Sequence, residues 1–316
     1  MNVALSHYDL DGISCQIVLR KYIGEFTKFN TGYNKIDNYI KILDEHIFNN
    51  SPKFVFITDL AFTIEQLEKV NALAQKYKSV KFIFIDHHPF DDDFGHLKRD
   101  NLKIIISKKY SATILLLKYL EKKSNKIYSD LRDFCNIVNA FDTWLEDDKD
   151  FKKGLLYNEL FWKYGLNVFW NKFKDNYRVS LNDKETYKKL IKNKNKLFNK
   201  LEDSGRIFKT KDKNMLMIFL DNYMTFVTLD YPGYKMYIII NSKGKISIRL
   251  KLNDDIIIEF QKKLLGILDD MPNIKNAGGH YGAMGVNLEK NDSQSIINFS
   301  KEFMERSDQL FAQYNM

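Results

Sequence analysis

Short apolar runs alternate with stretches of helical periodicity along the first 120 residues. The runs are apolar at consecutive positions, as in residues 54–57, which is typical of strands buried on both faces. Between them, apolar residues recur three or four positions apart, as in residues 36–48, which predicts amphipathic helices. We predict strands at residues 2–6, 25–29, 53–58, 81–85 and 103–106. The alternation predicts an α/β domain with a mostly parallel sheet flanked by helices.

Further helices are predicted along the same half of the chain. Thr63 is followed three residues later by Gln66, which is the spacing of a capping box at a helix start. Residues 111–120 and 128–175 also have helical periodicity. The second stretch carries large aromatic residues, and their helical spacing is more typical of a core than of a base-stacking surface. They are Tyr157, Phe161, Trp162, Phe169 and Trp170.

The character of the sequence changes in its last third. Residues 181–204 are rich in Lys and Asn, with Leu on one stripe, which predicts a solvated helical linker. Beyond it we predict strands at residues 215–219, 225–229, 236–240 and 245–251, and helices near 255–267 and 293–312. This pattern indicates a smaller α+β domain. We therefore divide the chain into a first domain at 1–180, the linker at 181–204, and a second domain at 205–316.

Acidic residues follow several predicted strands directly. Asp11, Asp59 and Asp86 each come just after an apolar run. Ligands of open α/β sheets bind beyond the carboxyl ends of the strands, so we expect these three side chains along one rim. Taken singly, each signal is weak, because an Asp after a strand is more often a helix cap and Asp11-Gly12 more often a turn.

Histidines accompany the carboxylates at this rim. Carboxylates gathered in one place repel each other unless a cation lies among them, and carboxylate with imidazole suits Mn²⁺ or Mg²⁺. Two such ions would form a clamp on the attacking and leaving oxygens of a phosphoryl group. The candidate residues are His7, Asp9, Asp11, Asp59, Asp86, His87, His88 and Asp142.

The order of these residues resembles the DHH family of phosphoesterases, which takes its name from the run that stands here as Asp86-His87-His88. The motifs occur in sequence as His7-x-Asp9-x-Asp11-Gly12, Asp59, Asp86-His87-His88 and Asp142. Gly278-Gly279-His280 resembles the motif of the associated DHHA1 domain. The resemblance spans both halves of the chain. Within the family, the chain is similar in type to the short-oligoribonuclease (NanoRNase) and RecJ-like members.

The resemblance implies a role for each matching residue. One Mn²⁺ would be held by His7, Asp9 and Asp59, and a second by Asp11, Asp59, His87 and Asp142. Asp86 would orient a ligand histidine. His88 would face the substrate phosphate or the leaving oxygen as a general acid.

The resemblance also implies substrate contacts in the second domain. Gly278 and Gly279 would let backbone N–H groups approach a phosphate, and His280 would contact the substrate. Arg249 resembles an arginine that clamps a phosphate with its guanidinium fork. The chain departs from the family here, because the motif usually has more glycines before its histidine and Leu250 stands where a serine often follows the arginine.

Composition narrows the class of protein and its location. The net charge of +8 favours polyanionic partners. Two cysteines cannot build a disulfide framework or a zinc cluster and suit a reducing compartment. The sequence has neither a signal peptide nor a run of roughly 18 apolar residues that could cross a membrane. We expect a cytoplasmic protein, in the host's cytoplasm if the gene is viral.

The sequence leaves several functions open. We favour a Mn²⁺-dependent phosphodiesterase that cleaves short oligonucleotides or dinucleotides to mononucleotides, because the chain has room for two domains and little more. The alternatives are a cyclic dinucleotide hydrolase, a 3′-phosphoadenosine 5′-phosphate phosphatase, a single-strand exonuclease, and a non-catalytic scaffold that binds nucleic acid. The oligomeric state is open, with a homodimer among the options.

Overall fold

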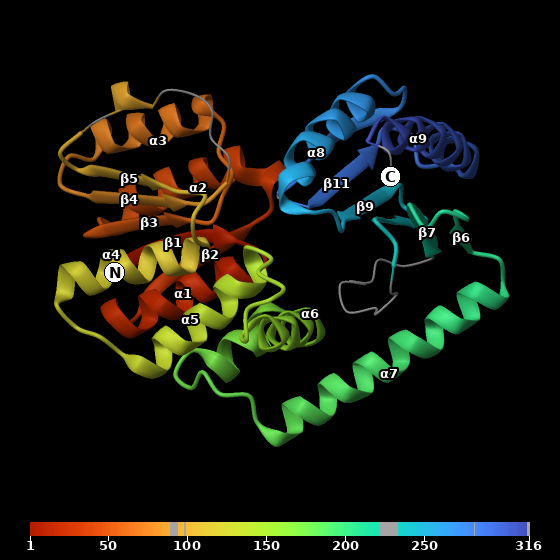
Figure 1. The fold of residues 1–316 in the computed structure, drawn as a ribbon. Helices are drawn as coiled ribbons and strands as arrows, with labels where there is room; N and C mark the ends of the chain where they lie inside the picture. The colour runs from red at the N-terminus through yellow and green to blue at the C-terminus, as the bar shows by residue number, and fades with distance from the viewer. Residues whose placement is uncertain (89–93, 98, 221–232, 281, 315–316) are drawn as a thin grey trace. The chain divides into compact units, whose positions relative to one another are not determined.

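The computed structural model describes residues 1–316 except 89–93, 98, 221–232, 281 and 315–316 (Figure 1). The chain divides into two compact units, Met1–Tyr187 and Lys188–Met316. The division falls within the long helix α7 (Leu181–Asp203). Each unit is described by itself.

The first unit contains a sheet in which all the strands are parallel. The strands are β1 (Asn2–His7), β2 (Phe26–Thr31), β3 (Phe54–Thr58), β4 (Lys81–Asp86) and β5 (Leu102–Ile106). Their spatial order is β2-β1-β3-β4-β5, so the chain reverses direction across the sheet between β1 and β3. This confirms the predicted α/β fold with a parallel sheet. Such a reversal opens a crevice at the carboxyl ends of the strands.

Helices cover both faces of this sheet (Figure 1). One face is covered by α2 (Ile36–Asn50) and α3 (Ile64–Lys76), and the other by α1 (Leu10–Ile23), α4 (Ala112–Ser124), α5 (Ser129–Asp142) and α6 (Phe151–Phe173). Successive strand residues point into opposite cores, as Val3 and Ala4 do. Both faces are dry, which explains why the strands are apolar at consecutive positions.

Two helices show how well the sequence specified the local structure. The capping box at the start of α3 is confirmed, because Thr63 Oγ1 accepts from Gln66 N and Gln66 Oε1 accepts from Thr63 N. In α6 the prediction of core aromatics is right for Tyr157, Phe161 and Phe169, which are buried. It is wrong for Trp162, whose indole is 43% exposed.

The second unit contains a sheet of order β10-β11-β9-β8-β7-β6. Its strands are β6 (Ile207–Lys209), β7 (Met215–Leu220), β8 (Met236–Asn241), β9 (Lys245–Leu250), β10 (Ile274–His280) and β11 (Ala283–Leu288). Helices α8 (Asp254–Asp269) and α9 (Ser293–Gln313) pack against it through an apolar core. Strands β6, β10 and β11 were not predicted from the sequence. The strand predicted at 225–229 lies outside the described residues.

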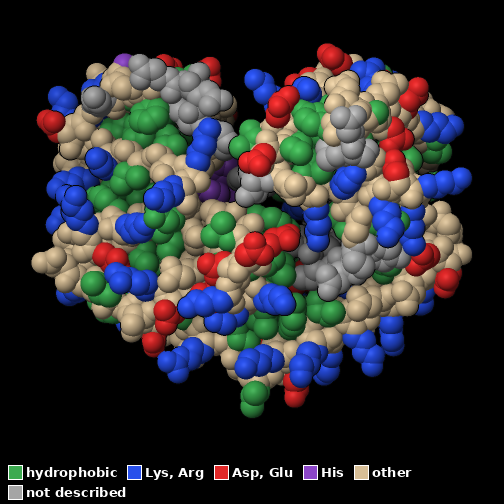
Figure 2. Space-filling view, viewed as in Figure 1, with side chains coloured by type: hydrophobic (Ala, Val, Ile, Leu, Met, Phe, Trp, Pro, Cys, Tyr) green, Lys and Arg blue, Asp and Glu red, His purple; other side chains and the backbone are tan. Residues whose placement is uncertain are grey.

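Charge is spread over the surface of the chain. Lys and Arg side chains are scattered over the face shown in Figure 2, and they recur along its lower edge, where α7 runs in Figure 1. Within the described residues, none of the helices combines the length and the apolar character needed to cross a membrane.

Candidate metal centre

The turn after β1 brings His7 and Asp9 together. His7 is the last residue of β1, and Asp9 caps α1 by accepting the Gly12 N–H at 2.9 Å. The second oxygen of Asp9 lies 2.7 Å from His7 Nδ1. A Cβ at position 12 would lie 2.3 Å from the His7 carbonyl oxygen, so only glycine lets the helix start this close to the strand. Asp11-Gly12 is therefore part of the site and not an isolated turn.

Asp59 stands directly after β3 and faces two different histidines. Its Oδ2 is 4.0 Å from His7 Nδ1, and its Oδ1 is 3.3 Å from His87 Nε2. The side chain is buried, and its backbone has a φ of 57°. Left-handed backbone is costly for a residue with a Cβ and is found mostly where function requires it. Asp59 thus presents one oxygen to each of two groups of ligand atoms.

The second group combines residues from two helices and the loop after β4. His87 Nε2 lies 3.3 Å from Asp142 Oδ2 and 4.0 Å from Asp11 Oδ2. Asp142 is the last residue of α5, and Asp11 lies in the first turn of α1. The Asp11 carboxylate also accepts the backbone N–H groups of Ala112 at 2.8 Å and Thr113 at 3.1 Å, at the start of α4. These bonds fix its position beside His87.

The histidine at the end of the DHH run has a carboxylate partner of its own. His88 Nδ1 lies 2.7 Å from Asp86 Oδ1, and both side chains are buried. The predicted role of Asp86 in orienting a ligand histidine stays a prediction, and the side-chain hydrogen bond described for it goes to His88. Asp86 therefore fixes the ring of His88 and leaves Nε2 as the nitrogen that can exchange a proton.

Tyr33 lies beside His7 and His88 and was not among the residues predicted from the sequence. It lies in the short 3₁₀ helix η1 (Tyr33–Lys35) that follows β2. Its Oη is 2.9 Å from His88 Nε2, and its ring stacks on His7 with centroids 4.3 Å apart. The only sequence signal is the Gly32-Tyr33 pair after a predicted strand, and such a pair is equally typical of a loop.

Two known proteins resemble this chain in sequence or in fold. The chain is 30% identical over 176 residues to the oligoribonuclease NrnB of Bacillus subtilis, an overlap of 52% of this chain and 42% of that protein. Its fold matches the pGpG-specific phosphodiesterase PggH from Vibrio cholerae with a TM-score of 0.52 at 13% identity, over 99% of both chains. The relatedness to NrnB supports the resemblance to the DHH family of phosphoesterases that the ordered motifs suggest.

A further structural match has the same fold. An uncharacterized protein from Helicobacter pylori G27 shares the fold with a TM-score of 0.50 at 16% identity, over 96% of this chain and 99% of that one. No family model matches the sequence. The chain spans less than half the length of the curated relative that it matches. The comparisons therefore establish the fold.

The electrostatics of the site favour a bound cation. We call its residues the DHH cluster: His7, Asp9, Asp11, Asp59, Asp86, His87, His88 and Asp142. Burial raises the pKa of Asp59 well above its ordinary value, and the Asp9 and Asp11 carboxylates raise it further. Burial also raises the pKa of Asp142 well above its ordinary value, and Asp11 adds to this effect. For His7, burial alone would lower the pKa, but the Asp9 carboxylate outweighs burial and raises the pKa. A bound cation would oppose the repulsion that disfavours the ionised carboxylates.

The residues present fit divalent metal ions. Asp59 Oδ2 and Asp142 Oδ2 are buried and accept no hydrogen bond from the described residues. Burying a charged oxygen without a partner costs free energy unless a bound ion compensates its charge. Ligand atoms lie within 4.8 Å of one another in each of three groups: His7, Asp9 and Asp59; Asp11, His87 and Asp142; and Asp59, Asp86, His87 and His88. Imidazole and carboxylate together suit Mn²⁺ or Mg²⁺.

The predicted substrate-binding residues of the second unit lie on β9 and β10, the two strands that flank β11. Arg249 in β9 is opposite Ala283 of β11. Gly278 and Gly279 belong to β10 at the sheet edge, so this run is not a turn between a strand and a helix. A Cβ at Gly279 would lie 2.0 Å from the Ala283 carbonyl oxygen, so hairpin packing requires that glycine. The side chain of His280 lies outside the described part of the structure, and substrate binding by all four residues stays a prediction.

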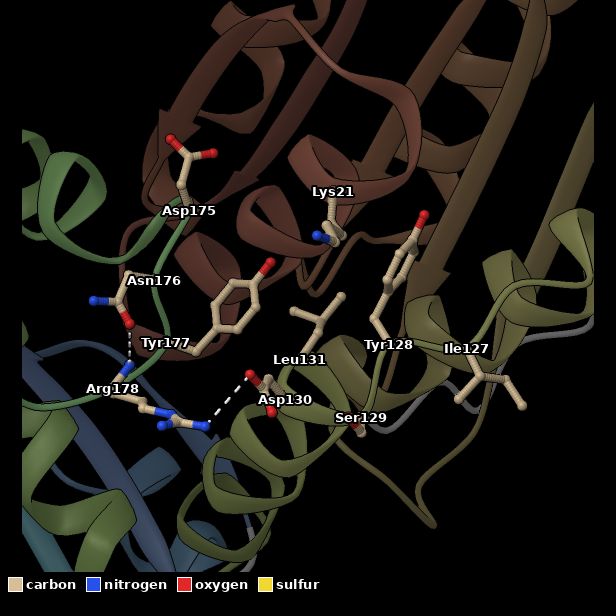
Figure 3. Close-up of a pocket in the computed structure, with 10 residues that line it drawn as sticks. All are labelled: Lys21, Ile127, Tyr128, Ser129, Asp130, Leu131, Asp175, Asn176, Tyr177 and Arg178. Carbon is tan, nitrogen blue, oxygen red and sulfur yellow. Dashed lines mark hydrogen bonds and ion pairs between the residues drawn. The ribbon is translucent and has the colours of Figure 1, made fainter.

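A separate cavity lies at the other end of α1 and α5 from the DHH cluster. It has a volume of about 340 Å³. Its lining shown in Figure 3 includes Lys21 in the last turn of α1 and Asp130 in the first turn of α5. Its two cationic side chains already have partners, because Lys21 lies over the Tyr128 ring and Arg178 pairs with Asp130. The cavity includes none of the DHH motif residues.

Proposed function

We propose that this chain is a metal-dependent phosphodiesterase that hydrolyses short oligonucleotides or dinucleotides to mononucleotides. The observation that carries the proposal is the position of Asp59, whose two oxygens face two separate groups of histidine and carboxylate ligands. That arrangement suits a pair of metal ions that share one bridging carboxylate. The activities for which NrnB and PggH are named, on oligoribonucleotides and on pGpG, support a short substrate.

We assign the metal ligands from the two groups. One ion would be held by His7, Asp9 and Asp59, and the other by Asp11, His87 and Asp142 together with Asp59, whose Oδ1 lies 3.3 Å from His87 Nε2. Divalent ions bound there would neutralise phosphate charge and lower the pKa of a nucleophilic water. We favour Mn²⁺ over Mg²⁺, because two imidazoles take part and Mg²⁺ prefers oxygen ligands.

The chain's own groups supply the proton for the leaving oxygen. We assign this role to His88, since its Nδ1 side is held by Asp86 and the other ring nitrogen, Nε2, is the one that would hold a proton toward the leaving oxygen. Tyr33 Oη lies at hydrogen-bond distance from that nitrogen and keeps the imidazole in one orientation. In the second unit we assign phosphate binding to Arg249.

A hydrolysis panel tests the proposal. Purified protein with added Mn²⁺ is offered pApA, pGpG, a five-nucleotide RNA, cyclic di-AMP, 3′-phosphoadenosine 5′-phosphate and a ~30-nucleotide single-stranded DNA. We expect the short linear species to be turned over fastest, with loss of turnover in Asp59→Asn. Asp37→Asn serves as the matched control, because this exposed carboxylate pairs with Lys69 far from the DHH motifs in the sequence.

Each outcome of the panel selects a function. Preference for cyclic di-AMP, for the bisphosphate or for the long DNA would replace the proposed substrate by that class. Absence of turnover with every substrate, while Mn²⁺ still binds, would overturn the proposed hydrolysis and favour a binding role. Equal activity of Asp59→Asn and the wild type would refute the metal site itself.

A further inference from the structure

Two half-exposed aromatic side chains stand beside the loop that carries the metal ligands. Tyr8 lies between His7 and Asp9 in the sequence, and its side chain is 42% exposed. Trp162 of α6 is 43% exposed, and its ring centroid lies 6.3 Å from that of Tyr8. Hydrophobic residues of this size normally gain more from burial than from exposure. Two of them side by side at the edge of a candidate active site form a surface suited to a flat apolar group.

Buried neighbours hold both rings in place. Tyr8 and Trp162 each pack edge-on against Phe161, which is fully buried, with centroids 5.8 and 5.1 Å apart. Trp162 Nε1 donates to Asn158 Oδ1 at 3.1 Å, and Asn158 is buried. The backbone N–H of Tyr8 donates to the Thr31 carbonyl oxygen at 3.1 Å. The polar edge of the indole is thus satisfied inside the protein, while part of each ring remains open to solvent.

We propose that Tyr8 and Trp162 form a stacking platform for a nucleobase of the substrate. The inference rests on the proposed function and deepens it, because it assigns the base-binding element of the same site. A phosphate held by ligands at positions 7 and 9 would place the attached nucleoside next to position 8. Every base has a π-face, so aromatic platforms bind bases with little sequence preference. The platform therefore predicts affinity for nucleotides over sugar phosphates, and broad tolerance of base identity.

Binding of two small probes tests the platform without catalysis. The full-length Mn²⁺-loaded protein is titrated with AMP and with ribose 5-phosphate, which share the phosphate and the ribose but differ in the base. Calorimetry gives both dissociation constants. Fluorescence gives a second readout, because stacking on Trp162 should quench part of the emission. The wild type should bind AMP at least tenfold more tightly than ribose 5-phosphate.

Leucine variants then remove each ring. Tyr8→Leu and Trp162→Leu should each weaken AMP binding about tenfold, and should leave ribose 5-phosphate binding unchanged. Trp162→Phe keeps a ring and should recover much of the loss. On pApA the leucine variants should raise KM and leave kcat nearly unchanged. Phe48→Leu is the matched control, because Phe48 is 74% exposed on α2 and should affect neither probe.

The outcomes separate this inference from the proposed function. Equal loss for both probes would show a general structural effect and overturn the platform, as would unchanged AMP affinity in both leucine variants. If no phosphodiester is hydrolysed but AMP binding depends on the two rings, the proposed hydrolysis fails and the platform stands. If pApA is hydrolysed with the same KM in all variants, the hydrolysis stands and the platform fails.

Discussion

Replacing Asp59 with Asn should change stability in opposite directions with and without metal. Without metal, the ionised Asp59 carboxylate is disfavoured by burial and by the neighbouring carboxylates, which is why its pKa is raised. Asn has nearly the same shape and carries no charge. At neutral pH the metal-free variant should therefore unfold at a temperature equal to or above that of the wild type.

With metal the order should reverse. Mn²⁺ at 100 times its dissociation constant stabilises the folded wild type by about 2.7 kcal/mol for each site. For a unit of this size, about 1 kcal/mol shifts the melting temperature by roughly 2–4 °C, so each site should add roughly 5–10 °C. Asp59→Asn removes the ligand that both sites share and should lose most of this gain. Its kcat/KM on pApA should fall by about 10³-fold or more.

Differential scanning calorimetry in EDTA and in Mn²⁺ measures both effects, with Asp37→Asn as the control for a lost surface carboxylate. The reasoning would be refuted if the metal-free variant melted well below the wild type, because Asp59 would then stabilise the apo fold by its charge. It would also be refuted if Mn²⁺ stabilised the variant and the wild type equally, because Asp59 would then not be a shared ligand.

Four further results are expected. Tyr33→Phe keeps the ring on His7 and removes the hydroxyl from His88, so kcat should fall roughly tenfold with Mn²⁺ affinity unchanged by calorimetry; an unchanged kcat would exclude a positioning role. His88→Asn should lower kcat on pApA by about 10²–10⁴-fold but lower it much less on a nucleotide p-nitrophenyl ester, whose leaving group needs no proton; equal losses on both would argue against a general acid. Because the pKa values of Asp59 and Asp142 are raised, the folded metal-free protein binds more protons than the unfolded chain above pH ~4. Its melting temperature should therefore rise as the pH falls from 7 toward 5, and bound Mn²⁺ should abolish this rise. Gly12→Ala should destabilise the protein by about 2 kcal/mol or more, measured by urea unfolding, because its Cβ would meet the His7 carbonyl oxygen at 2.3 Å.

The parallel sheet, and the gathering of carboxylates and histidines at its edge, could be predicted because their signals are local or ordered along the chain. Strands buried on both faces are apolar at every position, so β3 and β4 were located within about one residue. The carboxyl ends of parallel strands share one edge, so Asp59 and Asp86 were expected to meet. The motif order of the DHH family then supplied His7 and Asp142, which periodicity alone could not assign.

Features that depend on tertiary packing were not visible in the sequence. Tyr33 reaches a histidine 55 positions away, and nothing in its local sequence distinguishes it from a loop tyrosine. Trp162 shares its helical spacing with buried Phe161 and Phe169, and only the packing decides which of the three reaches solvent. The β10 strand contains two glycines, which lower strand propensity, and its hairpin with β11 overrides that local preference.

The carboxylates of the cluster fall into two kinds, and the difference explains where a cation is needed. Asp9 and Asp11 accept backbone N–H groups at the starts of α1 and α4, so the fold itself satisfies part of their charge. Asp59 and Asp142 have a buried oxygen without such a donor among the described residues. The two carboxylates share His87, whose Nε2 lies 3.3 Å from each, and Asp59 also has a positive φ. The helix starts thus position the first pair, whereas the second pair gains a stable charged state only when metal binds, so folding and metal loading should be coupled through Asp59 and Asp142.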